Sequence, residues 1–178
     1  MGTAEMTRKK SGNIISAGSE ELFEIAELMF DQGKSIIVEA RGDDMYPFLR
    51  HRVDRAEIFR VAASNIRVSD IVFIKHGGGY TFRRVCKING DGFYVTGDAW
   101  TLTDGPYCKG DIAGKVTSIY RKEKRVLCSS PMMRTLVLAW RVARPVRPYI
   151  VYACNKLRNT GARSDDRGYA FAWRHGHR

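Results

Sequence analysis

Apolar residues recur at helical spacing near the start of this chain of 178 residues. Between residues 20 and 32, leucine, phenylalanine, isoleucine, alanine and methionine side chains fall on one face of a helix. Ser19 precedes the segment as a candidate N-cap, and Gly33 follows it as a stop. The pattern therefore predicts a helix over residues 20 to 32.

The central part of the chain consists of short β-branched runs, several of which alternate between apolar and polar residues. The predicted strands cover residues 35–40, 55–61, 70–75, 80–88, 92–96 and 111–121. Glycine-rich turns separate them, and the Asn-Gly-Asp-Gly turn at 89–92 is a strong hairpin signal. Many short strands after one leading helix predict a mainly β domain, an antiparallel β barrel with an N-terminal helix.

Helical spacing returns after residue 130. One face of a helix over residues 131–143 carries Met133, Leu136, Val137 and Trp140, while Arg134 and Arg141 lie on another. Pro145 and Pro148 break this helix, and residues 149–157 resume it. The predicted organisation is a flexible N-terminus at 1–18, a β domain at 19–126, a basic amphipathic helical segment at 127–158 and a flexible tail at 159–178.

Charge divides the chain at the same place. Residues 1–120 hold 16 Lys and Arg against 16 Asp and Glu, whereas residues 121–178 hold 14 against 3, so the whole net charge of +11 lies in the second part. A basic amphipathic helix bearing tryptophan is typical of a segment that meets an anionic membrane surface or an acidic partner. The predicted contact residues are Arg134, Trp140, Arg141, Arg144 and Arg147. Nucleic acid is a less favoured partner, and packing of the apolar face on the β domain is the structural alternative.

The loop at residues 42–49 reads Gly-Asp-Asp-Met-Tyr-Pro-Phe-Leu, and two further motifs follow it in the chain. These are Tyr-Thr-Phe-Arg-Arg-Val at 80–85 and Val-Thr-Gly-Asp at 95–98. In order and spacing they resemble the Gly-x-Ser-Met-x-Pro, Lys-Arg-Val or His-Arg-Val, and Gly-Asp motifs of signal peptidase I and its relatives. The resemblance covers residues 35 to 120 and includes Gly-Asp-Ile-Ala-Gly-Lys-Val at 110–116. It implies the β fold of signal peptidases and of the self-cleaving SOS repressors.

The two catalytic positions of that family are changed in this chain. Asp44 stands where the resemblance places the nucleophilic serine, and Arg83 stands where it places the lysine or histidine base. A guanidinium group has no lone pair with which to accept a proton, and it stays charged at physiological pH. We therefore expect no intact catalytic dyad, and we expect Asp44 and Arg83 to form an ion pair in its place. The alternative is that Asp44 only accepts backbone hydrogen bonds in a tight turn.

The predicted binding site surrounds that pair. The peptide-binding loop comprises Gly42, Asp43, Asp44, Met45 and Pro47, and the supporting residues are Arg84, Gly97, Asp98 and Asp104. No cofactor or metal is expected, because the four cysteines lack ligand spacing and neighbouring histidines. Clustering of Asp43, Asp44, Asp98 and Asp104 around a hard cation is a minor alternative.

These features predict a pseudopeptidase that binds a peptide or protein partner without cleaving it. One alternative is an active serine endopeptidase that processes a precursor or signal peptide with Ser35, Ser64 or Ser69 as nucleophile. The other is a binder of anionic surfaces or nucleic acid through the basic tail. A narrower resemblance, at Met-Tyr-Pro-Phe-Leu-Arg in 45–50, is to signal-peptidase-like proteins found beside peptide natural-product maturation systems. The absence of an apolar secretory segment predicts a cytoplasmic location, with peripheral membrane association as an option.

Overall fold

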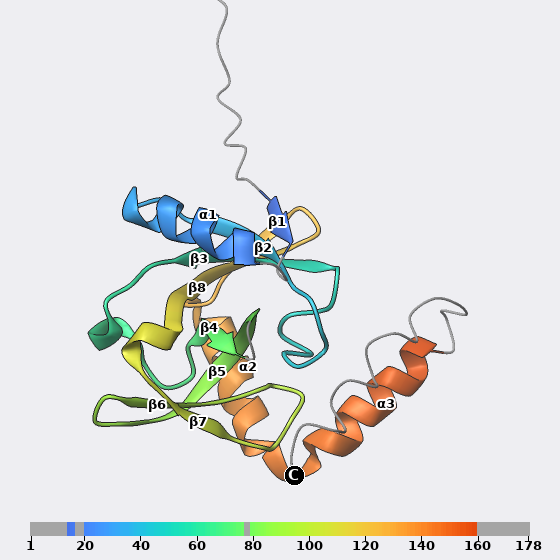
Figure 1. Ribbon diagram of the computed structural model, residues 1–178. Helices are drawn as coiled ribbons and strands as arrows, with labels where there is room; N and C mark the ends of the chain where they lie inside the picture. Colours follow the sequence, from blue (N-terminus) through green and yellow to red (C-terminus); the bar gives the residue numbers. More distant parts are fainter. Residues whose placement is uncertain (1–13, 17–19, 77–78, 160–178) are drawn as a thin grey trace, which may run out of the picture.

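The chain folds as a mainly β protein around one curved sheet (Figure 1). The computed structural model describes residues 14–16, 20–76 and 79–159. The strands are β1 (Ile14–Ser16), β2 (Ile36–Glu39), β3 (Asp54–Phe59), β4 (Ile71–His76), β5 (Gly79–Asn89), β6 (Gly92–Thr96), β7 (Asp104–Tyr107), β8 (Ile112–Arg121) and β9 (Lys124–Leu127). Their order in the sheet is β1-β2-β3-β8-β4-β5-β6-β7, and β9 pairs with β8. All six predicted strands are present.

The sheet is an antiparallel half-barrel, which confirms the mainly β, antiparallel part of the predicted barrel. Every strand pair is antiparallel except β1 with β2. Register shifts interrupt the β3–β8, β4–β8, β5–β6 and β6–β7 pairs. Irregularities of this kind increase the local twist and bend of a strand, and they account for the curvature. The edge strand β7 was not predicted, because it contains Gly105 and Pro106, which are unfavourable inside a sheet but tolerated at its edge.

The core consists of two clusters of apolar side chains. The larger one joins Ala26 and Phe30 of a helix to apolar residues of β2, β3, β4 and β8, among them Ile58 and Ile119. The smaller one gathers Val72, Val85 and Val95 with other apolar side chains of β4, β5 and β6. Strand β4 contributes to both, with Ile71 and Phe73 in the larger cluster and Val72 and Ile74 in the smaller one. Because successive side chains of a strand point to opposite faces, the two clusters lie on opposite faces of β4.

Helix α1 (Glu20–Asp31) covers the β2 end of the sheet (Figure 1). It ends at Gly33, which has a φ of 67°. The amide of Gly33 donates to the carbonyl of Phe30, and the amide of Lys34 donates to that of Met29. A left-handed residue after the last turn favours glycine, which is why this helix ends here. Ser19, the predicted cap, lies outside the described residues.

The C-terminal segment forms α2 (Pro131–Val142) and α3 (Arg147–Asn159), joined by the short helix η3 (Arg144–Val146). Two other single-turn helices, η1 (Ala63–Asn65) and η2 (Lys109–Asp111), lie in loops. Ser130 caps α2 by accepting from the amide of Met133. The α2 helix lies against the sheet, whereas α3 projects away from it (Figure 1).

Contacts of α2 correct part of the predicted tail surface. Val137 is buried, and Met133 packs against the larger core cluster. Trp140 lies edge-on to Phe48, and its indole nitrogen donates to the backbone carbonyl of Asp98 at 2.8 Å. Arg147 is 4% exposed and donates to the carbonyl of Trp140. Trp140 and Arg147 therefore hold the segment to the β domain, because their polar groups reach backbone carbonyls rather than solvent.

The predicted flexible ends fall mostly outside the described residues. Within the segment predicted as flexible, residues 14–16 form β1 and pair in parallel with β2. Residues 1–13, 17–19 and 160–178 carry no structural description. In the part of the chain that is described, no helix has the length and apolar content needed to cross a bilayer.

Candidate functional site

The loop that follows β2 is fixed at both of its ends. Gly42 has a φ of 81°, and its amide donates to Nδ1 of His51 at 3.0 Å. The guanidinium of Arg121 donates to the carbonyls of Pro47 and Phe48. The side chain of Met45 is buried in the larger core cluster. These contacts fix the loop to the β domain and leave Asp44 at the surface of the loop.

The anchor of this loop is a buried carboxylate between two arginines. Asp54 is fully buried and accepts hydrogen bonds from the side chains of Arg50 and Arg121. It also accepts from the amide of Arg50 at 3.0 Å. Burial raises the pKa of Asp54, but the hydrogen bonds from both arginines outweigh burial and hold that pKa below its ordinary value.

The lowered pKa of Asp54 predicts a pH dependence of stability. Because the folded protein binds the Asp54 proton less tightly than the unfolded chain does, this stabilisation is present above the ordinary pKa of 3.8 and is lost as the pH falls through the folded pKa. We expect Asp54→Asn to lower the free energy of unfolding by on the order of 2 kcal/mol at neutral pH and by less in acid. Chemical denaturation of both proteins between neutral pH and acid measures the difference. An unchanged difference throughout would contradict an ionised Asp54.

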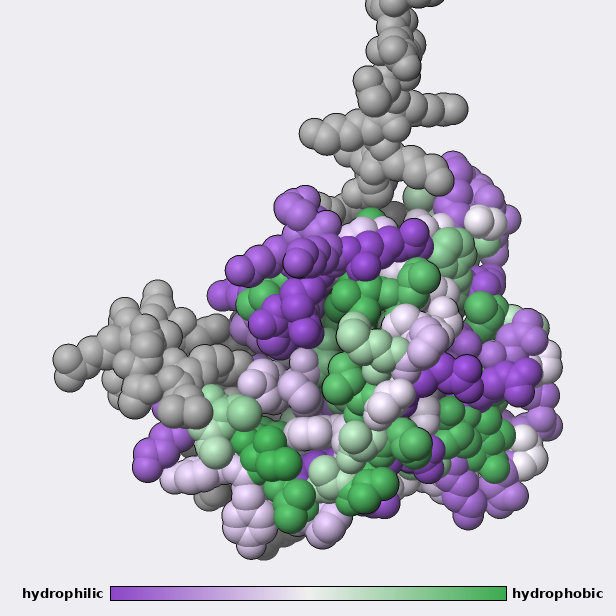
Figure 2. Space-filling model, turned by 180° about the vertical axis from the view of Figure 1, so that it is seen from behind, coloured by the Kyte–Doolittle hydropathy of each residue, from purple (hydrophilic) through white to green (hydrophobic). Residues whose placement is uncertain are grey.

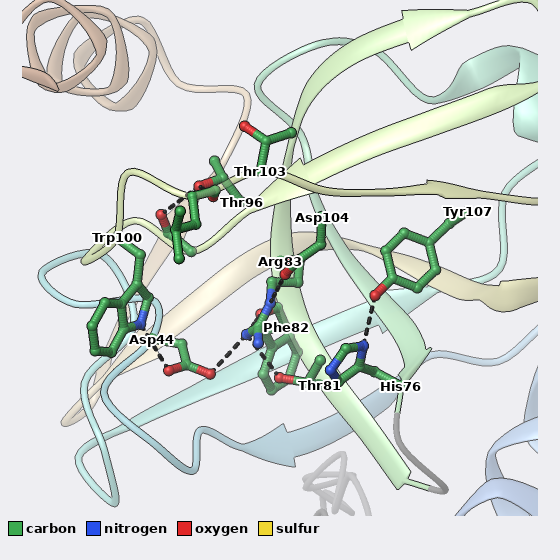
Figure 3. Close-up of polar contacts among 12 residues, drawn as sticks. Asp44, His76, Thr81, Phe82, Arg83, Thr96, Trp100, Thr103, Asp104 and Tyr107 are labelled. Atoms are coloured by element: carbon green, nitrogen blue, oxygen red, sulfur yellow. Dashed lines mark hydrogen bonds and ion pairs between the residues drawn. The ribbon is translucent and has the colours of Figure 1, made fainter. Parts of the chain in front are cut away.

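The predicted ion pair between Asp44 and Arg83 is present (Figure 3). Nη1 of Arg83 lies 2.8 Å from Oδ2 of Asp44, and the same nitrogen donates to the hydroxyl of Thr81 and the carbonyl of Phe82. Nε of Arg83 lies 4.0 Å from a carboxylate oxygen of Asp104. The side chain of Arg83 is 6% exposed, and that of Asp44 is 36% exposed.

The second carboxylate oxygen of Asp44 accepts from the indole nitrogen of Trp100 at 3.0 Å. Both oxygens of Asp44 therefore have donors, and the alternative in which Asp44 serves only backbone turns is wrong. Asp44 does contribute its backbone as well, since its carbonyl accepts from the amide of Ala99. A buried guanidinium can stabilise negative charge here, but it cannot take a proton from a nucleophile.

The Gly-Asp turn packs directly against the Asp44 loop. A Cβ at Gly97 would lie 2.6 Å from the carbonyl oxygen of Asp44, so only glycine allows this approach. Its neighbour Asp98 is fully buried and accepts two hydrogen bonds of 2.6 Å from Arg84. Arg84 also donates to the carbonyl of Ser69 and lies over the ring of Phe48. Two of the supporting residues predicted from the sequence, Arg84 and Asp98, thus pair with each other, and Gly97 packs against the Asp44 loop.

The four aspartates of the alternative cation site do not share one environment. Asp98 is paired with Arg84, and Asp44 is paired with Arg83. Asp104 of β7 also lies near Arg83, and Asp43 is exposed. Among the described residues, no group of three or more metal-ligating side chains gathers.

Several residues at the site were missed by the sequence interpretation. Trp100 and Thr81 bond to the two members of the ion pair. Farther along β4 and β7, His76 contacts the hydroxyl of Tyr107 at 2.6 Å (Figure 3). Burial and the nearby Asp104 raise the pKa of Tyr107, while Arg83 opposes them. Thr81 lies two residues before Arg83 on one strand face, and that spacing was an available signal.

One stretch of β5 has a strand partner on one side only. Residues 79–84 pair with β4, whereas pairing with β6 begins at Arg84 and continues toward Asn89. Over residues 81–83, the described structure shows β5 paired with β4 but not with a second strand. Arg83 lies at the end of this stretch, next to Asp44.

No family model matches this chain, and no curated protein matches its sequence.

Proposed function

We propose that this protein is a signal-peptidase-like pseudopeptidase that binds an extended peptide beside the Asp44 loop and does not cleave it. The observation that carries the proposal is the ion pair between Asp44 and Arg83 at the two positions where the motif resemblance expects a nucleophile and its base. Each member of the pair lacks the chemistry of the residue it replaces, since the carboxylate is a poor nucleophile toward amides and the guanidinium stays protonated.

The edge of β5 at residues 81–83 supports peptide binding by strand addition. An added strand would form backbone hydrogen bonds with these residues, and such bonds need no catalytic group. Side chains of the added strand would alternate between the domain and solvent. Those near its end would meet the exposed ring of Trp100 and the carboxylate of Asp44, which are joined by a hydrogen bond.

The contacts of the other serines do not favour an active peptidase. The hydroxyl of Ser35 donates to Glu57, and the hydroxyl of Ser69 accepts from Arg141. Neither contact supplies a neutral lysine or histidine as a base. Ser64 lies exposed in η1, away from the Asp44 loop in sequence and on another connection of the sheet.

The proposal predicts binding without turnover. The full chain should not be labelled by a fluorophosphonate probe, and it should enrich peptides from a phage-displayed library of random dodecapeptides. With an enriched peptide bound, residue-resolved amide hydrogen exchange should slow by about tenfold or more in residues 81–83, because new backbone hydrogen bonds form along that edge. Amides of α2 serve as the control within the same molecule and should keep their rates.

Two outcomes would overturn the proposal. One is peptide hydrolysis or probe labelling that disappears when Ser35, Ser64 or Ser69 is replaced by alanine. The other is an enriched peptide that protects amides elsewhere and leaves exchange in residues 81–83 unchanged.

A further inference from the structure

The α2 helix is apolar on the side that faces away from the sheet as well as on the side that packs against it. Its inner face carries Met133, Val137 and Trp140. The outer face exposes Met132, Leu136, Leu138 and Val142, with exposed fractions of 64%, 51%, 60% and 76%. A helix on a protein surface normally turns charged residues to water, and a helix that is apolar all round is normally covered.

The exposed apolar surface continues beyond α2. Val146 of η3 and Tyr149 and Tyr152 of α3 are 47%, 76% and 70% exposed. Seen from behind, apolar residues gather on the lower part of the molecule, over α2 and the start of α3 (Figure 2). The α3 helix of 13 residues projects from the domain, and isolated helices of this length are marginal in water. Both features indicate a binding surface that the described part of the chain leaves open.

Positive charge accompanies this surface. Residues 131–159 contain six lysines and arginines and neither aspartate nor glutamate. Three of the arginines, Arg141, Arg144 and Arg147, line a cleft of about 370 Å³ together with Leu138 and Val142. In the described structure, none of the three makes an ion pair with a carboxylate, and their hydrogen bonds go to Ser69 and to backbone carbonyls.

The chemistry of this cleft fits an anion. Arg147 forms its floor, and Arg141 and Arg144 are exposed at its rim. Burial lowers the pKa of Arg147, Asp98 opposes that shift, and the neighbouring arginines add to it. The one carboxylate in the cleft, Asp98, is already bound by two hydrogen bonds from Arg84. A phosphate group would offset the remaining positive charge and accept several hydrogen bonds from the guanidinium groups.

We infer that the surface formed by α2, η3 and the start of α3 docks on an anionic phospholipid bilayer, with a lipid phosphate in the cleft between Arg141, Arg144 and Arg147. A helix face on which apolar side chains alternate with arginines binds favourably at the boundary between lipid headgroups and acyl chains. A second copy of the same face is disfavoured as the occupant, because it would bring two positive surfaces together. This inference is independent of the proposed peptide site at β5.

Sedimentation with lipid vesicles tests the inference on the full chain. We expect the protein to sediment with vesicles of phosphatidylcholine and phosphatidylglycerol in equal parts and to stay in solution with phosphatidylcholine alone. Val142→Glu should weaken binding by about tenfold or more, because it removes apolar burial and adds a negative charge. The matched control is Leu28→Glu on α1, which adds the same negative charge at a side chain that is 60% exposed. This variant should bind vesicles nearly as well as the unchanged protein does.

The arginines are tested by a second pair of variants. Arg141→Gln with Arg144→Gln should weaken vesicle binding by about 25-fold, or about fivefold for each charge, whereas lysine at both positions should retain most of the binding. Binding should also fall steeply as salt is raised. The inference is overturned by absence of binding, by equal binding to neutral vesicles, or by equal effects of the two glutamate substitutions. Val142→Glu turning a dimer into a monomer without any lipid dependence would assign the surface to a second copy instead.

Discussion

Replacing Asp98 by alanine is expected to lower the free energy of unfolding by about 3–5 kcal/mol, because it leaves the guanidinium of Arg84 buried without its carboxylate. Asp98 is fully buried, and Arg84 is 6% exposed at the side chain. Two hydrogen bonds of 2.6 Å join them in a bidentate pair. Urea denaturation followed by tryptophan fluorescence and circular dichroism measures the loss.

An exposed ion pair provides the control for this experiment. Asp91 and Lys109 also form an ion pair, but their side chains are 86% and 57% exposed. Asp91→Ala should therefore change the stability by less than about 1 kcal/mol. Replacing Arg84 and Asp98 together by methionine and leucine should recover part of the loss, since apolar residues can fill the buried space without an unpaired charge. A small effect of Asp98→Ala would mean that Arg84 reaches solvent in the folded protein.

A double-mutant cycle on Asp44 and Arg83 is expected to give the second largest effect. Asp44→Ala should cost about 2–3 kcal/mol, at the low end for breaking a buried pair, because the carboxylate is partly exposed while Arg83 stays buried. Arg83→Met should cost a similar amount. The double variant should lose about 1–2 kcal/mol less than the sum of the single losses, since the residues are in direct contact.

The cycle separates the energy of the ion pair from the energies of the other hydrogen bonds that Asp44 and Arg83 make. Trp100 donates to Asp44 and would lose its acceptor in Asp44→Ala, so Trp100→Phe is the control that measures this bond alone. Asp104 lies 4.0 Å from Arg83 and could take over part of its charge. Strictly additive losses would contradict an energetic role for the pair. Additive losses would also weaken the interpretation that this ion pair supports the loop at the positions where the resemblance expects a catalytic dyad.

The strands could be predicted because their signals are local. Alternation of apolar and polar residues and β-branched composition mark β2 to β6 and β8, and Asn89 with Gly90 marks the turn between β5 and β6. The edge strands β7 and β9 lack that alternation, since Gly105 and Pro106 occupy one and charged residues begin the other. The extent of the barrel could not be predicted, because the bulges that curve the sheet leave no local sequence signal.

The residues of the candidate site were likewise predicted only in part. The motif order identified Asp44 and Arg83 as facing positions, although 38 residues separate them in the chain, and the ion pair between them is present. Trp100 was missed, because its hydrogen bond to Asp44 requires knowing which loops meet, whereas Thr81, which accepts from Arg83, could have been found from its spacing on the same strand. The predicted tail surface was partly wrong for the same reason. Trp140 and Arg147 look like surface residues in sequence, yet they bond to carbonyls of the β domain and of α2.

The sequence by itself determined the mainly β class, most strand positions and the change of charge after residue 120. These properties depend on residue type and on spacing along the chain. Only the tertiary structure decided that the sheet is a half-barrel, that Arg84 and Asp98 form a buried pair next to the loop, and that the described part of the chain leaves the outer face of α2 exposed. Each of these depends on contacts between distant segments, whose burial and register are set by packing and by backbone hydrogen bonding across strands.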